Sequence, residues 1–224
     1  MFGIEIVRSV DLGFRKYQKA ARRAALTAAL LLSGAAAALA GSAAAQTGQS
    51  WERIATPGDV QRLETGPNRL AEDVAVAAQQ GKVDGISLPA VMELMRAVAQ
   101  PLAERDLIGD WRCRSIQIDN LGIFAYPPFR CRVRQAGDGL FFEKLTGSQR
   151  VSGFLYMRDG VSFVLLGGAT VNEEPQRRYT SDSRAPAEVL QHNRAALVTK
   201  VGPGRLRFVF PQETGQFEVL DLTR

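Results

Sequence analysis

Residues Gly109–Arg134 read GDWRCRSIQIDNLGIFAYPPFRCRVR, and this stretch decides the fold of the chain. It contains both cysteines and one of the two tryptophans. At each of its ends arginine alternates with small or apolar residues, which is the period-two pattern of a β-strand with two different faces. We therefore predict two antiparallel strands, over residues 111–118 and 129–135, that lie side by side.

The two cysteines fall on the apolar faces of these strands. Alternation places Cys113 on one face with Trp111, and Cys131 on one face with Val133. Directly opposed residues of antiparallel strands lie at a separation that a disulfide can bridge, and an oxidising compartment favours the bond. We expect a Cys113–Cys131 disulfide, whose loop of about 18 residues contributes about 3 kcal/mol. The alternative, a redox-active pair, usually has two residues between its cysteines at a helix start.

The opposite face of the same two strands is basic. Such a face predicts a site for an anionic partner, such as an acidic protein surface, a lipid headgroup or a phosphate. The alternative is a solvated outer face that acidic neighbours such as Glu143 neutralise. The basic residues of this stripe are Arg112, Arg114, Arg130, Arg132 and Arg134.

Residues 107–224 have the texture of an antiparallel β domain, with short β-rich runs between turn signals. Asp159-Gly160 and Gly202-Pro203-Gly204 mark two hairpins. An even number of sequential hairpins can close on itself and remove exposed edges. We predict an eight-stranded antiparallel, lipocalin-like barrel or half-barrel, with a two-sheet sandwich as the alternative. The eight strands are expected over residues 111–118, 129–135, 140–146, 151–158, 161–166, 194–201, 206–210 and 216–222, with a long polar loop over 172–186.

Residues 46–106 predict a helical arm in front of this barrel, so the fold class is mainly β with an α+β organisation. Thr56-Pro57 is a helix start, because proline at the first helical position has no N–H to lose. We expect that helix to end near Gly66-Pro67, a second helix over 67–80 and a third capped by Ser87. The third carries an apolar stripe. The stripes are expected to cover one side of the barrel. The stripe of the third helix consists of Val91, Leu94, Met95 and Val98.

Residues 1–45 have the three regions of a secretory signal peptide. Residues 1–23 are basic, Ala24–Ala40 is an uncharged Ala/Leu run, and Ala43-Ala44-Ala45 offers small residues to a signal peptidase. We expect cleavage after about Ala45, by Sec or twin-arginine export, no stable membrane span afterwards, and a periplasmic protein. The alternative is a membrane anchor, but the run is short and mostly alanine.

The charge balance and the residue types argue against several classes of function. The chain has a net charge of +5, but without residues 1–45 it has 22 basic and 21 acidic residues, so we expect no nucleic-acid partner. With one histidine and two cysteines that pair with each other, we expect no metal site. No phosphate-binding loop, dinucleotide fingerprint or serine nucleophile elbow is present, and we expect no cofactor.

Four residues are candidates for a ligand-binding or structural cluster. Glu143 and Lys144 are neighbours and point to opposite faces of a strand, so one of them lies inside the barrel or at its rim. An interior carboxylate can have its pKa tuned by burial and act as a general acid or base. The full candidate cluster is Trp111, Glu143, Lys144 and Arg207.

Five motifs occur together in this chain, over Ala55–Leu63, Gly109–Arg114, Phe129–Arg132, Glu143–Arg150 and Gly202–Arg207. In this combination the chain resembles an uncharacterised family of exported proteobacterial proteins with a domain of unknown function (DUF4893), and this resemblance implies no activity. Gly109-x-Trp111 is also similar to the lipocalin signature, in which a late-strand arginine packs over the tryptophan. That resemblance implies this position for Arg207 or Arg224. Exported barrel inhibitors of proteases share such a start with one early disulfide.

Three functions follow as hypotheses. The first is a monomeric, non-enzymatic periplasmic module that binds a small apolar ligand or a protein partner. The second is an inhibitor of an exported hydrolase that acts through one end of the barrel. The third is an enzyme that uses an interior carboxylate, with Glu143, Lys144 or His192 as the reacting groups. We favour a non-enzymatic role, since no catalytic constellation is visible. A barrel filled by side chains would favour a surface partner over a small ligand.

Overall fold

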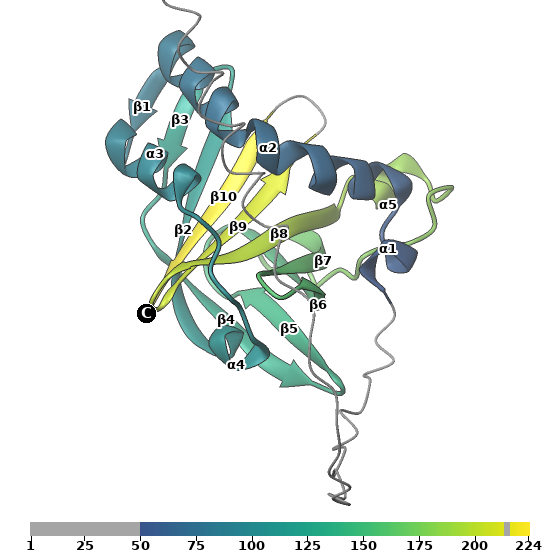
Figure 1. The fold of residues 1–224 in the computed structure, drawn as a ribbon. Helices are drawn as coiled ribbons and strands as arrows, with labels where there is room; N and C mark the ends of the chain where they lie inside the picture. Colours follow the sequence, from purple (N-terminus) through teal and green to yellow (C-terminus); the bar gives the residue numbers. More distant parts are fainter. Residues whose placement is uncertain (1–49, 213–215) are drawn as a thin grey trace, which may run out of the picture. The chain divides into compact units, whose positions relative to one another are not determined.

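The computed structural model describes residues 50–212 and 216–224, and the expected signal peptide lies outside them. Eight antiparallel strands close into a barrel (Figure 1), so the predicted eight-stranded barrel is confirmed and the sandwich alternative is wrong. Each predicted strand corresponds to one barrel strand. These are β2 (Gly109–Asp119), β4 (Phe129–Ala136), β5 (Gly139–Lys144), β6 (Gln149–Asp159), β7 (Ser162–Val171), β8 (Asn193–Gly202), β9 (Arg205–Pro211) and β10 (Phe217–Thr223).

Strand β2 closes the barrel, because it pairs with the last strand along one edge and with two strands along the other. Its residues 112–118 pair with β10, residues 109–113 pair with β4, and residues 116–119 pair with β3 (Gly122–Ala125). Strand β1 (Lys82–Asp84) extends the sheet by pairing in parallel with β3. Neither β1 nor β3 was predicted, because three or four residues are too few to show a period of two.

The barrel interior is filled by apolar side chains. In the middle, the rings of Phe142 and Phe208 approach to 4.7 Å between centroids, and both residues are fully buried. Inward residues of all eight strands belong to one core cluster that also contains Leu102 and Leu107. Burying such side chains is the main favourable term in folding. The small-ligand hypothesis therefore needs a site other than the middle of the barrel.

Cys113 and Cys131 form the predicted disulfide, with 5.9 Å between their Cα atoms. Both are fully buried on the inward face. The predicted geometry was wrong in one respect, since the two cysteines are not directly opposed. Trp111 pairs with Cys131, and Cys113 pairs with Phe129, so the bond runs diagonally across the pair of strands. A two-residue offset keeps both side chains on one face, which is why the bond still forms.

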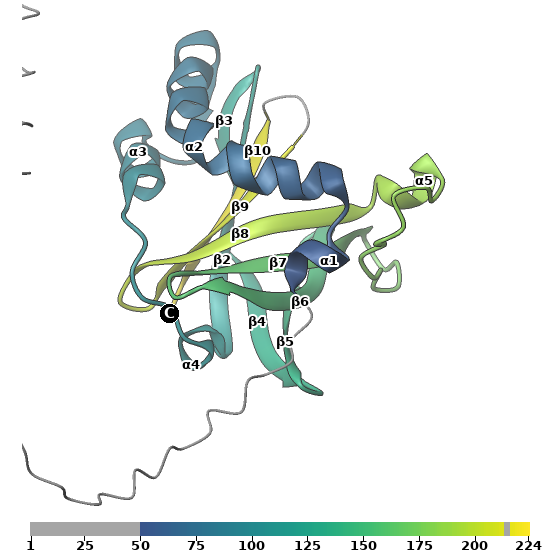
Figure 2. The ribbon, with the colours of Figure 1, turned by 45° about the vertical axis from the view of Figure 1, so that its right-hand side comes forward.

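Helix α2 (Pro57–Gln80) is one continuous helix of 24 residues, and the prediction that it ends at Gly66-Pro67 was wrong. Pro67 cannot donate a hydrogen bond to the preceding turn, and such a residue usually bends a helix. Figure 2 shows the change of direction within α2. The helix continues because apolar residues on both sides of the proline, Leu63 and Leu70, are buried.

Helices α2 and α3 (Leu88–Arg96) cover one outer side of the barrel, as the apolar stripes predicted. Ser87 caps α3, and its Oγ accepts a hydrogen bond from the Ala90 backbone N–H. Val98 lies beyond the helix and is 82% exposed, so it is not part of the stripe. The packed face consists of Leu70, Val74, Ala77, Val91, Leu94 and Met95 against Val209, Phe217 and Val219.

Three short helices complete the fold. Helix α1 (Trp51–Ile54) packs near β6, and α4 (Glu104–Leu107) leads directly into β2. Helix α5 (Ala187–Leu190) ends the long polar connection between β7 and β8, and it was not predicted. Across residues 50–212 and 216–224, none of the helices combines the length and apolar character needed to cross a bilayer.

One end of the barrel is closed by the last residue of the chain. The Arg224 guanidinium lies 4.3 Å from the centre of the Trp111 ring and donates to the Ile108 and Asp106 carbonyls. The indole N–H of Trp111 donates to the Leu107 carbonyl at 2.8 Å. Of the two arginines that the lipocalin resemblance suggested, Arg224 occupies the position over the tryptophan.

We expect Arg224→Ala to lower the free energy of unfolding by about 1–3 kcal/mol, because it removes a cation–π contact and two hydrogen bonds to backbone carbonyls. Thermal denaturation should show a fall in Tm of about 2–4 °C for each kcal/mol. The matched control is Arg184→Ala, in a side chain that is 94% exposed. Equal melting temperatures for the two variants would contradict this role of Arg224.

Candidate functional site

Charged side chains gather inside the other end of the barrel. Strand β5 ends there, whereas β8 and β10 begin there. Side chains alternate between the two faces of each strand, so Lys144, Arg194 and Glu218 point inward at these strand ends. Charges are rare inside a protein because their desolvation is expensive, so three at one barrel end form the first candidate for a functional site.

Lys144 is the most deeply buried of the three, with 7% of its surface exposed. Its ammonium lies 4.3 Å from the centre of the Phe129 ring. Burial lowers the pKa of Lys144, and the negative charge of Glu218 partly opposes that shift. Among the described residues no carboxylate comes within 4.0 Å of its Nζ. Lys144 is therefore a buried amine held by an aromatic ring rather than by an ion pair.

Glu218 is the interior carboxylate of the barrel. It accepts a hydrogen bond of 2.7 Å from the Ser115 hydroxyl on β2. Its negative charge favours the protonated forms of both Lys144 and Arg194, although it forms no ion pair with either. This carboxylate balances one of the two interior cations, so the site keeps a net positive charge.

Arg194 connects this interior with a pocket at the rim. Its Nη1 donates to the carbonyls of Gln191 and Asn193 at 2.9 and 2.8 Å. Burial lowers the pKa of Arg194, while the charges of Glu218 and Asp59 oppose that shift. Within the described ranges no carboxylate forms an ion pair with it, so the remaining guanidinium N–H groups can bind an anion.

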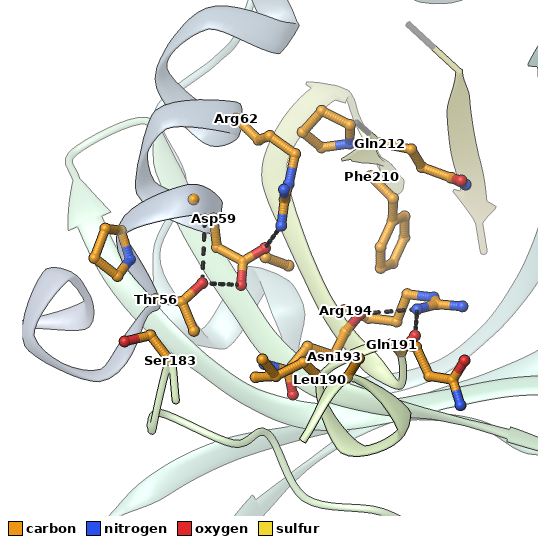
Figure 3. Close-up of a pocket in the computed structure, with 15 residues that line it drawn as sticks. Thr56, Asp59, Arg62, Ser183, Leu190, Gln191, Asn193, Arg194, Phe210 and Gln212 are labelled. Atoms are coloured by element: carbon orange, nitrogen blue, oxygen red, sulfur yellow. Dashed lines mark hydrogen bonds and ion pairs between the residues drawn. The ribbon is translucent and has the colours of Figure 1, made fainter. Parts of the chain in front are cut away.

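The pocket has a volume of about 770 Å³, within the range of small-molecule sites. It lies between the start of α2, the segment around α5 and the end of β9. Figure 3 shows Thr56 and Asp59 on one side, with Arg194 and Phe210 on the other. One part of the wall is polar and the other is apolar. The apolar part is formed by Pro57, Ala187, Leu190, Ala195, Phe210 and Pro211.

A buried polar network builds one wall of the pocket. Asp59 accepts hydrogen bonds from the Thr56 hydroxyl at 2.7 Å, from Arg62 at 2.7 Å and from the Tyr179 hydroxyl at 2.5 Å. Burial, followed by the hydrogen bond to Asp59, raises the pKa of Tyr179 to about 12. Tyr179 thus ties the long polar loop to the start of α2. Because Asp59 already accepts these hydrogen bonds, Arg194 faces the pocket without a carboxylate partner in the described part of the chain.

The four residues proposed as a cluster do not come together, and that prediction was wrong. Trp111 lies at the opposite, closed end. Arg207 is outside the barrel and donates to the Leu94 and Met95 carbonyls at 2.8 Å. Glu143 also points outward, where it contacts Arg134. Of the four, Lys144 alone lies inside the polar end.

The arginine stripe lies on the outer face, as alternation predicted. Arg132 forms an ion pair with Asp110 at 2.6 Å, and Arg134 forms one with Glu143 at 3.3 Å. The neutralised-face alternative therefore holds for these two arginines. It does not extend to the whole stripe, since Arg112 and Arg130 have no ion pair in the part of the chain that the structure describes.

The sequence contained a signal for the residues that the cluster prediction missed. Arg194 shares its strand face with Ala196 and Val198, and Glu218 shares its face with Leu220 and Leu222. Each charge therefore sits on an apolar face at a strand end. Thr56 and Asp59 have the three-residue spacing of a helix cap. Tyr179 offered no signal, since its loop has no periodicity.

A family model described as "Domain of unknown function (DUF4893)" matches residues 51–222. The chain belongs to the DUF4893 family. The match covers the helices and nearly the whole barrel, so the polar end and its pocket lie within the family domain. The family's description names no activity, substrate or partner.

Two further comparisons add no function. A search of curated proteins finds no match. Among solved structures, the chain is similar to a redesigned β-barrel, with 10% sequence identity and a TM-score of 0.36. That alignment covers 57% of this chain and 98% of the designed one. The function of this family member must therefore be argued from its own residues.

The geometry also bears on the enzyme hypothesis. Glu143 cannot act as an interior carboxylate, because it lies on the outer face beside Arg134 and Gln176. In the described ranges, no three His, Cys, Asp or Glu side chains converge as a metal site would need. The polar end holds two cations, Lys144 and Arg194, and one carboxylate, Glu218, beside a pocket. This arrangement is suited to binding an anion.

We expect Lys144→Met to raise Tm near pH 7, because it removes a desolvated charge that has no ion pair among the described residues and keeps an apolar side chain beside the Phe129 ring. The folded-state pKa of Lys144 is lowered, so the unfolded chain binds its proton more readily. The penalty is complete below the folded-state pKa and disappears as the pH rises toward about 10. Thermal melts at several pH values should show the advantage of Lys144→Met shrinking with rising pH. A loss of stability that is the same at every pH would contradict this interpretation.

Proposed function

We propose that this protein is a non-enzymatic binding module whose ligand is a small amphipathic anion. The ligand occupies the pocket at the polar barrel end, with its anionic group on Arg194 and its apolar body against Phe210 and Leu190. The observation that carries the proposal is the Arg194 guanidinium, which faces a pocket of about 770 Å³ and has no carboxylate partner among residues 50–212 and 216–224.

The energetics of the pocket favour such a ligand. A hydrogen bond to a charged group contributes about 1.5–3 kcal/mol, and burial strengthens it. The apolar wall adds affinity in proportion to the ligand surface that it covers. A purely apolar ligand would leave the guanidinium desolvated and unpaired, which is unfavourable. The pocket therefore suits an anion with an apolar body better than the small apolar ligand that the sequence predicted.

The position of the pocket fits the filled barrel. Side chains occupy the middle of the barrel, and Trp111 with Arg224 closes the other end. Binding at the polar end needs no displacement of core residues. Thr56, Asp59 and Tyr179 already satisfy one another, so the wall is formed before a ligand arrives, and little ordering is required on binding.

Titration of the purified protein with decanoate and with 1-decanol tests the proposal. We expect decanoate to bind at least about tenfold more tightly than the alcohol, because only the carboxylate pairs with the guanidinium. Arg194→Gln should weaken decanoate binding by about 10–100-fold and leave the binding of the alcohol nearly unchanged. Calorimetry or NMR shift mapping measures both.

Arg105→Gln is the matched control, since it removes the same charge from an exposed residue of α4, away from the pocket. It should bind decanoate like the wild type. An equal loss of decanoate affinity in both arginine variants would mean that only net charge matters. Equal affinity for decanoate and 1-decanol would contradict the anion site.

We also propose that the protein is exported and works in the periplasm. The support is the leader-like composition of residues 1–45 together with the buried cysteine pair at bonding distance. Cell fractionation should recover the protein outside the cytoplasm, beginning near Gln46 and with no thiol that reacts after unfolding. Cytoplasmic protein with an intact leader and two reactive thiols would contradict export.

A further inference from the structure

We propose that the outer wall formed by β2, β4, β5 and β6 is an interaction surface for an acidic polypeptide. The surface is separate from the pocket and consists of arginines beside two phenylalanine rings. Its partner presents carboxylates to the arginines and an apolar side chain to the rings. We name it the arginine wall, and its residues are Arg112, Arg114, Arg130, Arg132, Arg134, Phe141 and Phe154.

The arginine wall is the part of the barrel exterior that the helices leave exposed. On the neighbouring side, the outward residues of β9 and β10, such as Val209 and Val219, are buried under α2 and α3. In contrast, every outward arginine of β4 is exposed. The ribbons in Figures 1 and 2 show α2 and α3 on the side of β9 and β10. The wall therefore remains accessible in the folded chain.

Its charge is not balanced by the residues that the structure describes. Arg112 is the direct cross-strand partner of Arg130, and like charges in that position repel each other. Arg114 is the cross-strand partner of Asp221, but Asp221 accepts both its ion-pair hydrogen bonds from Arg205. Three guanidinium groups thus have no carboxylate in the described ranges. Repulsion of this kind is relieved when a partner supplies carboxylates.

Aromatic rings extend the wall on one side. The rings of Phe141 and Phe154 meet edge to face with 5.1 Å between centroids, and the Arg134 guanidinium lies 5.0 Å from the centre of the Phe141 ring. Phe154 is 39% exposed. Arginine and aromatic residues are the types enriched in protein–protein interfaces and in their energetic centres.

These features favour a polypeptide with carboxylates over a membrane surface. Paired guanidinium groups match carboxylates bidentately, and the adjoining rings offer a contact for one apolar side chain of the partner. A bilayer surface attracts any cluster of basic side chains and does not need the bidentate geometry that guanidinium groups offer to carboxylates.

Poly-L-glutamate and a random glutamate–tyrosine copolymer serve as probes at low salt, where surface charges are least screened. The purified protein should bind both and prefer the copolymer severalfold. Arg112→Gln/Arg130→Gln should weaken binding of both by about tenfold or more, and should also raise Tm, because the opposed charges no longer repel. The control, Arg96→Gln/Arg105→Gln, removes the same charge elsewhere and should change binding less than about twofold.

Phe154→Gln isolates the aromatic part. It should abolish the preference for the copolymer and leave poly-L-glutamate binding unchanged. Equal losses in the two double variants would overturn the proposal, since net charge alone would then explain binding. So would binding to phosphatidylglycerol vesicles at salt concentrations where neither polypeptide binds, which would assign the wall to a lipid surface.

Discussion

The closure of the sheet at β2 is the constraint on which the rest of the structure depends. This strand follows α4 directly and pairs with the last strand on one edge and with β4 on the other. Closure leaves no free edge among the barrel strands, and it forces every inward side chain into one shared core. The Cys113–Cys131 bond joins β2 to β4 across the pairing that completes the ring. A barrel closed and filled in this way leaves its ends and outer wall for function.

The two ends differ because different residue types complete the strands there. At one end Arg224 covers Trp111, and the apolar core reaches the rim. At the other end, the inward positions carry Lys144 and Arg194, and the negative charge of Glu218 acts on both cations. An apolar rim can be sealed by packing, whereas desolvated charges attract an anion or a carboxylate partner. The asymmetry therefore gives the barrel a stable base and a polar end suited to binding.

The outer surface is divided in a similar way. Helix α2 passes through Pro67 without ending and, with α3, buries the apolar outward residues of β9 and β10. The outward residues of β4 are arginines, for which an apolar helix face offers no partner. The strand sequences thus decide which side the helices cover. They also decide which side remains available to other molecules.

Alternation along single strands was enough to predict eight barrel strands, their inward and outward faces, the disulfide and an outward arginine stripe. It works because side chains of a strand point to opposite faces whatever the strand packs against. Alternation does not report which distant strands become neighbours, or in what register. Only the tertiary structure shows that Lys144, Arg194 and Glu218 lie at one end of the barrel. It also shows that Arg224, and not Arg207, packs over Trp111, and that Tyr179 donates a hydrogen bond to Asp59. These contacts connect residues from widely separated segments, so they exist only once the ring has closed.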